Sequence, residues 1–196
     1  MTEDGRQADA PPLWIALLHH PVLNRERAVV TTAITNLDVH DIARAARTYG
    51  VRRYFVVTPI ERQRDLAQAI VGHWRTGPGA SRVPERGEAL RLVETVPALD
   101  DAVAAVTAEA GARPVLVATC ARPGRATIGF ERMGEILRAQ QPTLLLFGTG
   151  WGLADEVLAR VDHVLAPIDT PGGDYNHLSV RSAAAVMLDR LLGRHS

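Results

Sequence analysis

The sequence has 196 residues, 46% of them hydrophobic, which predicts one globular domain with a sizeable core. Its 22 basic residues are all arginine, which excludes chemistry that needs a lysine, such as a Schiff base or the Walker phosphate loop. The formal net charge is zero, so any nucleic-acid surface has to be a local patch. Nine arginines against five acids between Arg25 and Arg75 fit such a patch, although many solvated faces have a similar balance.

Targeting signals are not recognisable in the sequence. Residues 1–11 carry charge without a following signal-peptide core, so we expect a disordered lead-in there and a single domain over 12–196. No stretch approaches the roughly 18 apolar residues needed to span a bilayer, so no membrane partner is expected. The lone cysteine, Cys120, excludes an intrachain disulfide and fits a reducing compartment, so a cytoplasmic location is predicted.

Strands and helices are predicted to alternate along the chain. In chain order we expect a strand at 13–20, a loop through Pro21 and Asn24, a helix at 39–49, a strand at 53–58, a helix at 61–74, a loop at 77–87, a strand at 90–96, a helix at 99–110, a strand at 114–120, a helix at 130–140, a strand at 143–147, a helix at 153–160, a strand at 163–168 and a helix at 178–192.

The expected strands are continuous apolar runs, which is typical of a mainly parallel sheet with helices on both faces. In such an α/β fold, ligands bind beyond the carboxyl ends of the strands. The loops after Thr119, Phe147 and Ile168 are therefore the predicted site.

Two polar or glycine-rich segments follow the late strands. The run FGTGWGL at 147–153 has glycines that let backbone approach a flat ligand, but a plain turn explains it equally well. Its spacing differs from the dinucleotide fingerprint, and it follows a late strand rather than the first. The run DYNHLSVRSAAA at 174–185 places polar groups before an alanine-rich helix, and an ordinary capped helix is the plainer interpretation.

A third segment, NLDVHDIAR at 36–44, gathers amide, carboxylate, imidazole and guanidinium groups at a helix start. Asp38, His40 and Asp41 could imitate a metal site, yet no zinc or di-iron spacing is present, so no metal is expected. Serine-nucleophile chemistry is also not expected, because no Gly-x-Ser-x-Gly elbow occurs.

Together the three segments resemble the motifs of the SPOUT, or α/β-knot, RNA methyltransferases, and more closely a bacterial branch of that superfamily. The resemblance covers about residues 13–192. HDIARAARTYGV at 40–51 is similar to the first motif, whose arginine aligns with Arg44. Residues 144–153 are similar to the second motif, and 177–185 to the third, with Leu-x-Val and three alanines in register.

The resemblance implies a C-terminal trefoil knot, a homodimer with knot helices and first-motif helices facing each other, and bent S-adenosylmethionine bound in the knot. It implies methyl transfer to a nucleotide of tRNA or rRNA. The cofactor-binding positions that it implies share the three late loops: Thr119, Phe147, Gly148, Thr149, Gly150, Gly152, Ile168, Tyr175, Asn176, His177, Leu178 and Ser179.

For catalysis, the resemblance implies that Arg44 holds an RNA phosphate or lowers the pKa of the acceptor, and that Asp38 or His40 takes the proton. The sequence departs from the superfamily pattern at Asp38 and Ser179, where asparagines are usual. Because of these departures, one alternative is a knotted protein that binds cofactor or RNA but does not transfer a methyl group. An ordinary nucleotide-binding α/β enzyme without a knot is the remaining alternative.

Overall fold

The computed structural model describes residues 10–121, 124–169, 171 and 176–194. Most of the expected lead-in, and Tyr175 of the expected cofactor loop, lie outside the described residues. The elements are β1 (Leu13–Leu18), β2 (Val22–Leu23), β3 (Val29–Val30), α2 (Asn36–Thr48), β4 (Tyr54–Val57), α3 (Glu61–Arg75), α4 (Pro84–Leu90), β5 (Val93–Val96), α5 (Leu99–Ala110), β6 (Val115–Thr119), α6 (Phe130–Arg138), β7 (Thr143–Gly148), α7 (Asp155–Leu158), β8 (His163–Leu165) and α8 (Val180–Leu192).

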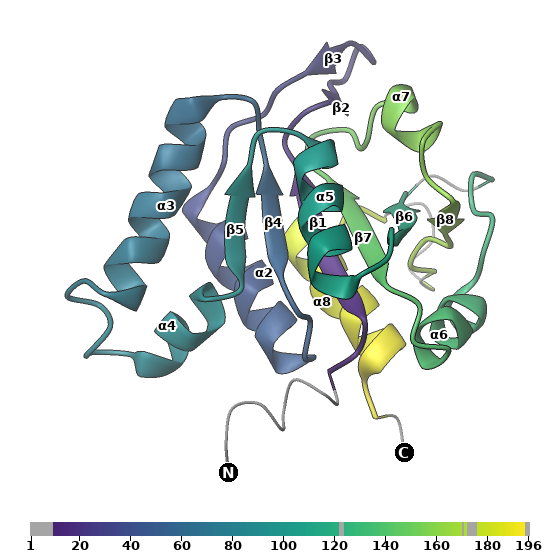
Figure 1. Cartoon of the computed structure of the whole chain (residues 1–196). Helices are drawn as coiled ribbons and strands as arrows, with labels where there is room; N and C mark the ends of the chain where they lie inside the picture. Colours follow the sequence, from purple (N-terminus) through teal and green to yellow (C-terminus); the bar gives the residue numbers. More distant parts are fainter. Residues whose placement is uncertain (1–9, 122–123, 170, 172–175, 195–196) are drawn as a thin grey trace.

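The central sheet confirms the predicted α/β class. Six strands lie in the order β5-β4-β1-β7-β6-β8, and every neighbouring pair is parallel. Helix α5 covers one face, whereas α2 and α8 lie behind the sheet in the view of Figure 1. The carboxyl ends of β7, β6 and β8 are consequently neighbours along one edge of the fold.

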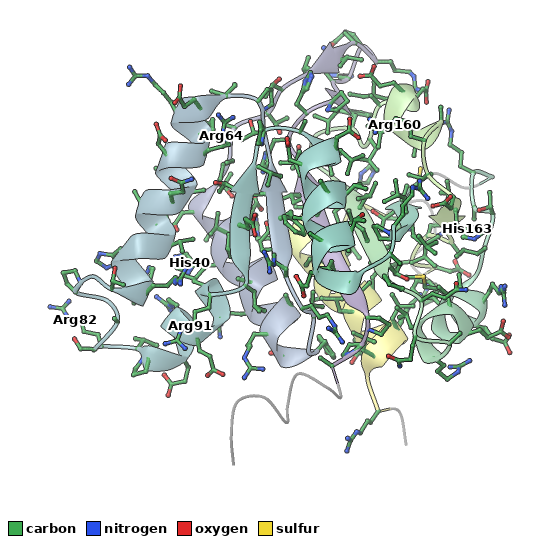
Figure 2. All side chains as sticks on the ribbon, in the orientation of Figure 1. His40, Arg64, Arg82, Arg91, Arg160 and His163 are labelled. Carbon is green, nitrogen blue, oxygen red and sulfur yellow. The ribbon has the colours of Figure 1, made fainter. Side chains whose placement is uncertain are left out.

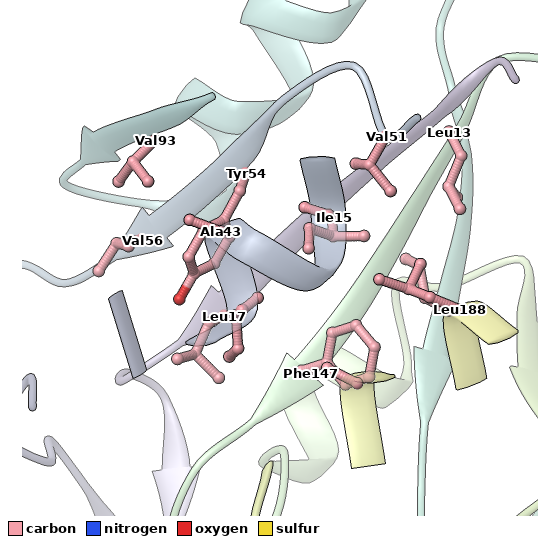
Figure 3. Packing of buried hydrophobic residues seen from close by; sticks show 14 of the residues in the cluster. Leu13, Ile15, Leu17, Ala43, Val51, Tyr54, Val56, Val93, Phe147 and Leu188 are labelled. Atoms are coloured by element: carbon pink, nitrogen blue, oxygen red, sulfur yellow. The ribbon is translucent and has the colours of Figure 1, made fainter. Parts of the chain in front are cut away.

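Two hydrophobic clusters explain why the strands are apolar throughout. Alternate side chains of β1 point to opposite faces, because side chains along a strand have a period of two. Leu13, Ile15 and Leu17 join the cluster under α2 and α8, shown in Figure 3, while Trp14 and Leu18 join the cluster under α5. Burial on both faces removes the polar alternation that marks a half-exposed strand.

The structure corrects several predicted boundaries. The loop expected after Pro21 contains the antiparallel hairpin β2–β3. The loop expected at 77–87 ends in α4, which begins at Pro84, a residue well suited to the first turn of a helix. Helix α7 and strand β8 are shorter than predicted.

Candidate functional site

The predicted loops come together because their strands are adjacent in the sheet. Thr119 ends β6, Gly148 ends β7, and Ile168 follows β8. A hydrogen bond from Thr119 Oγ1 to the carbonyl oxygen of Leu146 (3.0 Å) ties the first two strands at this edge. The sheet order therefore brings segments about 50 residues apart to one place.

The glycine-rich turn after β7 is fixed by the β2 strand. Trp151 N donates to the carbonyl oxygen of Leu23 (2.8 Å), and Leu23 N donates to the carbonyl oxygen of Gly152 (2.9 Å). Gly150 has φ +58°, and a Cβ there would lie 2.8 Å from the oxygen of Leu23. Glycine is required at this position because both the backbone angle and the close approach exclude a side chain.

Not every predicted position in this turn can offer a side chain to a ligand. Phe147 is buried and packs in the α2–α8 cluster. A Cβ at Gly148 would lie 2.7 Å from Leu153 N, so the chain is closely packed there. At Gly152, no atom beyond the glycine and its two chain neighbours lies within 4 Å of the position that a Cβ would occupy. These three positions can therefore contribute mainly backbone groups.

The loop after β8 is organised by its own polar side chains. Asn176 Nδ2 donates to the carbonyl oxygen of Ile168 (2.9 Å), which draws the two ends of the loop together. Ser179 caps α8 by accepting from Ser182 N (3.2 Å). Leu178 is exposed beside this cap, and His177 precedes it. Tyr175 lies outside the described residues, so its position stays a prediction.

A chain of hydrogen bonds that ends at the buried His19 supports the glycine-rich turn. Thr149 Oγ1 donates to the carbonyl oxygen of Leu18 (3.2 Å), and it lies 2.5 Å from Thr32 Oγ1. Thr32 Oγ1 is hydrogen-bonded to His19 Nδ1 at 3.1 Å. Thr32 therefore links the hydroxyl of Thr149 to the imidazole of His19.

His19 is the residue that the sequence reasoning missed. It is fully buried, and burial lowers the pKa of its imidazole from 6.5 to about 4, with nearby Asp38 opposing the shift. The ring is therefore neutral near pH 7. Its contact with Thr32 spans 13 positions, and the contact of Thr32 with Thr149 spans 117, so no local sequence pattern marks them.

Asp38 joins the first and third predicted motifs. Its Oδ1 accepts a hydrogen bond from Arg181 Nη1 of α8 (2.9 Å), and its Oδ2 accepts one from Thr35 Oγ1 (2.6 Å). Arg181 Nε also lies 3.5 Å from Asp41 Oδ2. Asp38 is buried, so these partners compensate the loss of water around its carboxylate.

The structure separates His40 from Asp38. His40 packs edge-on against Trp74 of α3, with ring centroids 5.7 Å apart, whereas Asp38 contacts α8. Arg44 is exposed two turns along α2, and its guanidinium is near enough to disfavour protonation of His40. The predicted catalytic residues thus share α2 but occupy different sides of it.

The chemical character of the three loops fits a ligand without phosphates. None of the predicted cofactor positions carries a carboxylate or a guanidinium, and exposed apolar groups are present at Trp151 and Leu178. Backbone groups and neutral side chains of this kind suit a small, largely apolar ligand. Within the described residues, no group of three His, Cys, Asp or Glu side chains is placed to hold a metal, and no helix is long and apolar enough to cross a membrane.

Comparison with known proteins identifies relatives over nearly the whole chain. The tRNA (guanine-N(1)-)-methyltransferase of Oleidesulfovibrio alaskensis is 47% identical over 193 residues, which are 98% of this chain and 45% of that protein. An uncharacterised protein of Aquifex aeolicus is 38% identical over 184 residues, covering 93% of this chain and 89% of that protein. The chain thus spans less than half the length of the curated relatives that carry a methyltransferase name.

The fold is shared with solved structures of low sequence identity. The SpoU methyltransferase AviRb from Streptomyces viridochromogenes, in complex with the cofactor AdoMet, matches with a TM-score of 0.57 and 20% identity, over 97% of this chain and 60% of that chain. Residues 12–193 also match the family described as SAM-dependent RNA methyltransferase. This chain therefore belongs to the SAM-dependent RNA methyltransferase family.

Proposed function

We propose that the protein transfers a methyl group from S-adenosylmethionine to a nucleotide of tRNA or rRNA. The observation that carries the proposal is the meeting of three loops at the ends of β7, β6 and β8, whose candidate cofactor positions carry no carboxylate or guanidinium, in a chain of this family. Thr119, the turn at 148–152 and the segment 176–179 would hold the cofactor. When bound, the cofactor supplies a methyl group that is already activated, so the protein has mainly to align the acceptor atom.

The acceptor is best placed on the Asp38 side of α2. Asp38 and Arg181 link α2 to the helix that follows the cofactor loop. Arg44 is exposed further along α2, on a different side of the helix, and can hold an RNA phosphate there. Proton removal by Asp38 is compatible with this arrangement, whereas His40 faces Trp74. The name of the Oleidesulfovibrio relative makes guanine N1 of tRNA the first acceptor to be screened.

A trefoil knot is part of the proposal, and chain connectivity supports it. Strand β8 is flanked by β6 on one side and by Thr127 and Ile128 on the other, since Ala166 N donates to Ile128 O (2.9 Å) and Ile128 N to Val164 O (3.2 Å). The chain must leave this position and reach α8, which packs with Ala184 and Leu188 in the cluster that includes α2, α6 and β7. A path through the loop between β6 and β7 accomplishes this connection.

We further propose a homodimer formed through α2 and α8, in the cytoplasm. Leu37 and Leu178 are both exposed, and they flank the Asp38–Arg181 pair at the start of these helices. Apolar side chains at such positions favour burial against a second copy. Leu37→Glu should convert the dimer to a monomer in light scattering, and an unchanged mass would contradict this interface.

The cofactor site is tested by calorimetry with S-adenosylmethionine and S-adenosylhomocysteine. Gly150→Ala should abolish binding, because the new Cβ collides with Leu23 O. Gly111→Ala is the matched control: Gly111 has φ +72° at the end of α5, but open space surrounds its missing Cβ. Binding that Gly150→Ala alone removes supports the site, and failure of the unmodified protein to bind either compound would overturn it.

One observation favours a binding protein without transfer as the second candidate. Both carboxylate oxygens of Asp38 already accept hydrogen bonds, from Arg181 and Thr35. The carboxylate is thus engaged in contacts within the protein. Cofactor binding without turnover on bulk tRNA and rRNA would support this candidate.

A further inference from the structure

Arginines are numerous on the side of the protein formed by α2, α3 and α4. On the opposite side, arginines pair with acids, as in Arg113–Asp162, Arg125–Asp155 and Arg132–Glu135. On α2, α3, α4 and their connections, Arg47 pairs with Glu88. Arg53, in the connection after α2, pairs with Glu94 and Glu109, and Arg64 of α3 donates to the carbonyl oxygen of Thr58. The other arginines of α3, α4 and the loop between them, and Arg44 of α2, are exposed or half-buried: Arg44, Arg62, Arg75, Arg82, Arg86 and Arg91.

Trp74 organises the centre of this surface. The guanidinium carbon of Arg86 lies 4.3 Å from the centroid of the Trp74 ring, and the His40 ring meets the same ring edge-on. Figure 2 shows His40 beside α3 and α4, with Arg82 at the loop that joins them. Residues from α2, α3 and α4 therefore converge on one aromatic ring.

Close backbone packing holds the Trp74 ring and Arg86 in place. A Cβ at Gly79 would lie 2.6 Å from Trp74 Cε3, and a Cβ at Gly87 would lie 2.6 Å from Trp74 O. The chain on either side of Arg86 thus packs directly on Trp74. A guanidinium stacked on an aromatic ring keeps its N–H groups directed outward in a fixed plane, which suits bidentate contact with an oxyanion.

The cations around His40 are not balanced within the cluster. Burial lowers the pKa of His40, and the neighbouring charges of Arg86 and then Arg44 act in the same direction, against Asp41. His40 Nδ1 is buried and has no hydrogen-bond partner among the described residues. Asp41 itself is within 3.5 Å of Arg181 on the other side. Two guanidinium groups, those of Arg86 and Arg44, therefore face His40 against the single carboxylate of Asp41.

We propose that Arg86, stacked on Trp74, forms with Arg44 and His40 a docking site for a backbone phosphate of RNA. The site lies across α2 from Asp38, a separation of about 10 Å given the width of a helix. The identification of RNA as the ligand of this docking site rests on the proposed function. An RNA strand that crosses α2 would contact this site and present the adjacent nucleotide on the Asp38 side, so the catalytic domain itself would supply substrate binding.

The experiment measures binding of bulk bacterial tRNA to the full chain by fluorescence anisotropy over a series of salt concentrations. Arg86→Gln should weaken binding about tenfold and reduce the slope of log affinity against log salt by about one, because one phosphate contact is lost. Arg86→Lys should keep the wild-type slope with a smaller loss of affinity, since it retains the charge and loses the planar fork. Thermal unfolding of each variant verifies that it is folded.

Arg132→Gln is the matched control, because Arg132 is an exposed arginine on α6, away from this cluster. It should leave tRNA affinity and salt slope unchanged. Wild-type affinity and slope in folded Arg86→Gln would overturn the docking site, as would a loss equal to that in Arg132→Gln. Calorimetry with S-adenosylmethionine tests the proposed function separately. Arg86→Gln should bind the cofactor normally. If the protein binds tRNA through Arg86 but does not bind the cofactor, the methyltransferase proposal is refuted and the docking site is not.

Discussion

Arg181 of α8 donates a 2.9 Å hydrogen bond from Nη1 to Oδ1 of Asp38 at the start of α2. The pair joins residues 143 positions apart and connects the helix after the cofactor loop to the helix that carries Arg44. At the other end of the same helices, Tyr49 Oη donates to Asp189 Oδ1 (2.9 Å). The two contacts fix α2 alongside α8 at both ends.

Replacing Arg181 by methionine should lower the free energy of unfolding by about 2 kcal/mol, because it leaves the buried Asp38 carboxylate without its cation. Arg113→Met is the control, since the Arg113–Asp162 pair is largely exposed and should contribute less than about 1 kcal/mol. Denaturant unfolding of both variants measures the difference. Equal losses in the two would contradict a special role for the Asp38 pair.

Removing the Thr149 hydroxyl should weaken cofactor binding. Thr149→Val breaks the contacts to Thr32 and to Leu18 O, so we expect a stability loss of about 1 kcal/mol and roughly tenfold weaker binding of S-adenosylhomocysteine. Thr107→Val also removes one hydroxyl-to-carbonyl bond, to Val103 O in α5, and should cost similar stability without affecting affinity. Calorimetry on both variants decides whether the effect is specific to the turn.

The buried His19 should make the fold sensitive to acid. Its pKa is lowered from 6.5 in the unfolded chain to about 4 in the fold, so the unfolded state binds more protons between these values. Stability is therefore fully retained above about pH 6.5 and falls by roughly 3 kcal/mol as the pH drops to about 4. Denaturant unfolding at several pH values measures this slope.

His19→Gln should reduce that slope between pH 6.5 and 4, even though it also lowers stability near pH 7. Thr107→Val, which removes no titratable group, is the control and should leave the slope as it is. A wild-type slope in His19→Gln would show that other groups cause the acid sensitivity.

Arg44→Ala should retain cofactor affinity and reduce methyl transfer about 100-fold at saturating RNA, because the acceptor is no longer held in line. Transfer is followed with labelled S-adenosylmethionine on the RNA that the acceptor screen selects. Arg132→Ala, which removes an exposed arginine of α6 away from the proposed RNA site, is the comparison. An unchanged rate in Arg44→Ala would refute the role assigned to Arg44.

The sequence predicts the bounds of strands and helices best where buried residues follow a regular pattern. Strands β1, β4, β6 and β7 were located within one or two residues, because a strand buried on both faces is a continuous apolar run. Helix α5 was predicted with its observed bounds, and Gly111 ends it at φ +72°. The hairpin β2–β3 was missed because its strands have two residues each, too few for any periodicity.

The candidate cofactor loops were also predictable, because parallel strands place their ligand sites at the carboxyl ends. Local sequence could not show that Thr149 is hydrogen-bonded to Thr32, that Leu23 requires glycine at position 150, or that Arg86 stacks on Trp74. Each of these contacts joins different elements.

The sequence by itself determined the α/β class, most elements and the family motifs, since these depend on local propensity and burial patterns. The tertiary structure alone decided how the three faces of α2 are used, with Asp38 toward α8, Arg44 exposed and His40 against Trp74. The physical reason is that a helix turns 100° per residue, so neighbouring residues acquire different partners only when the surrounding elements pack.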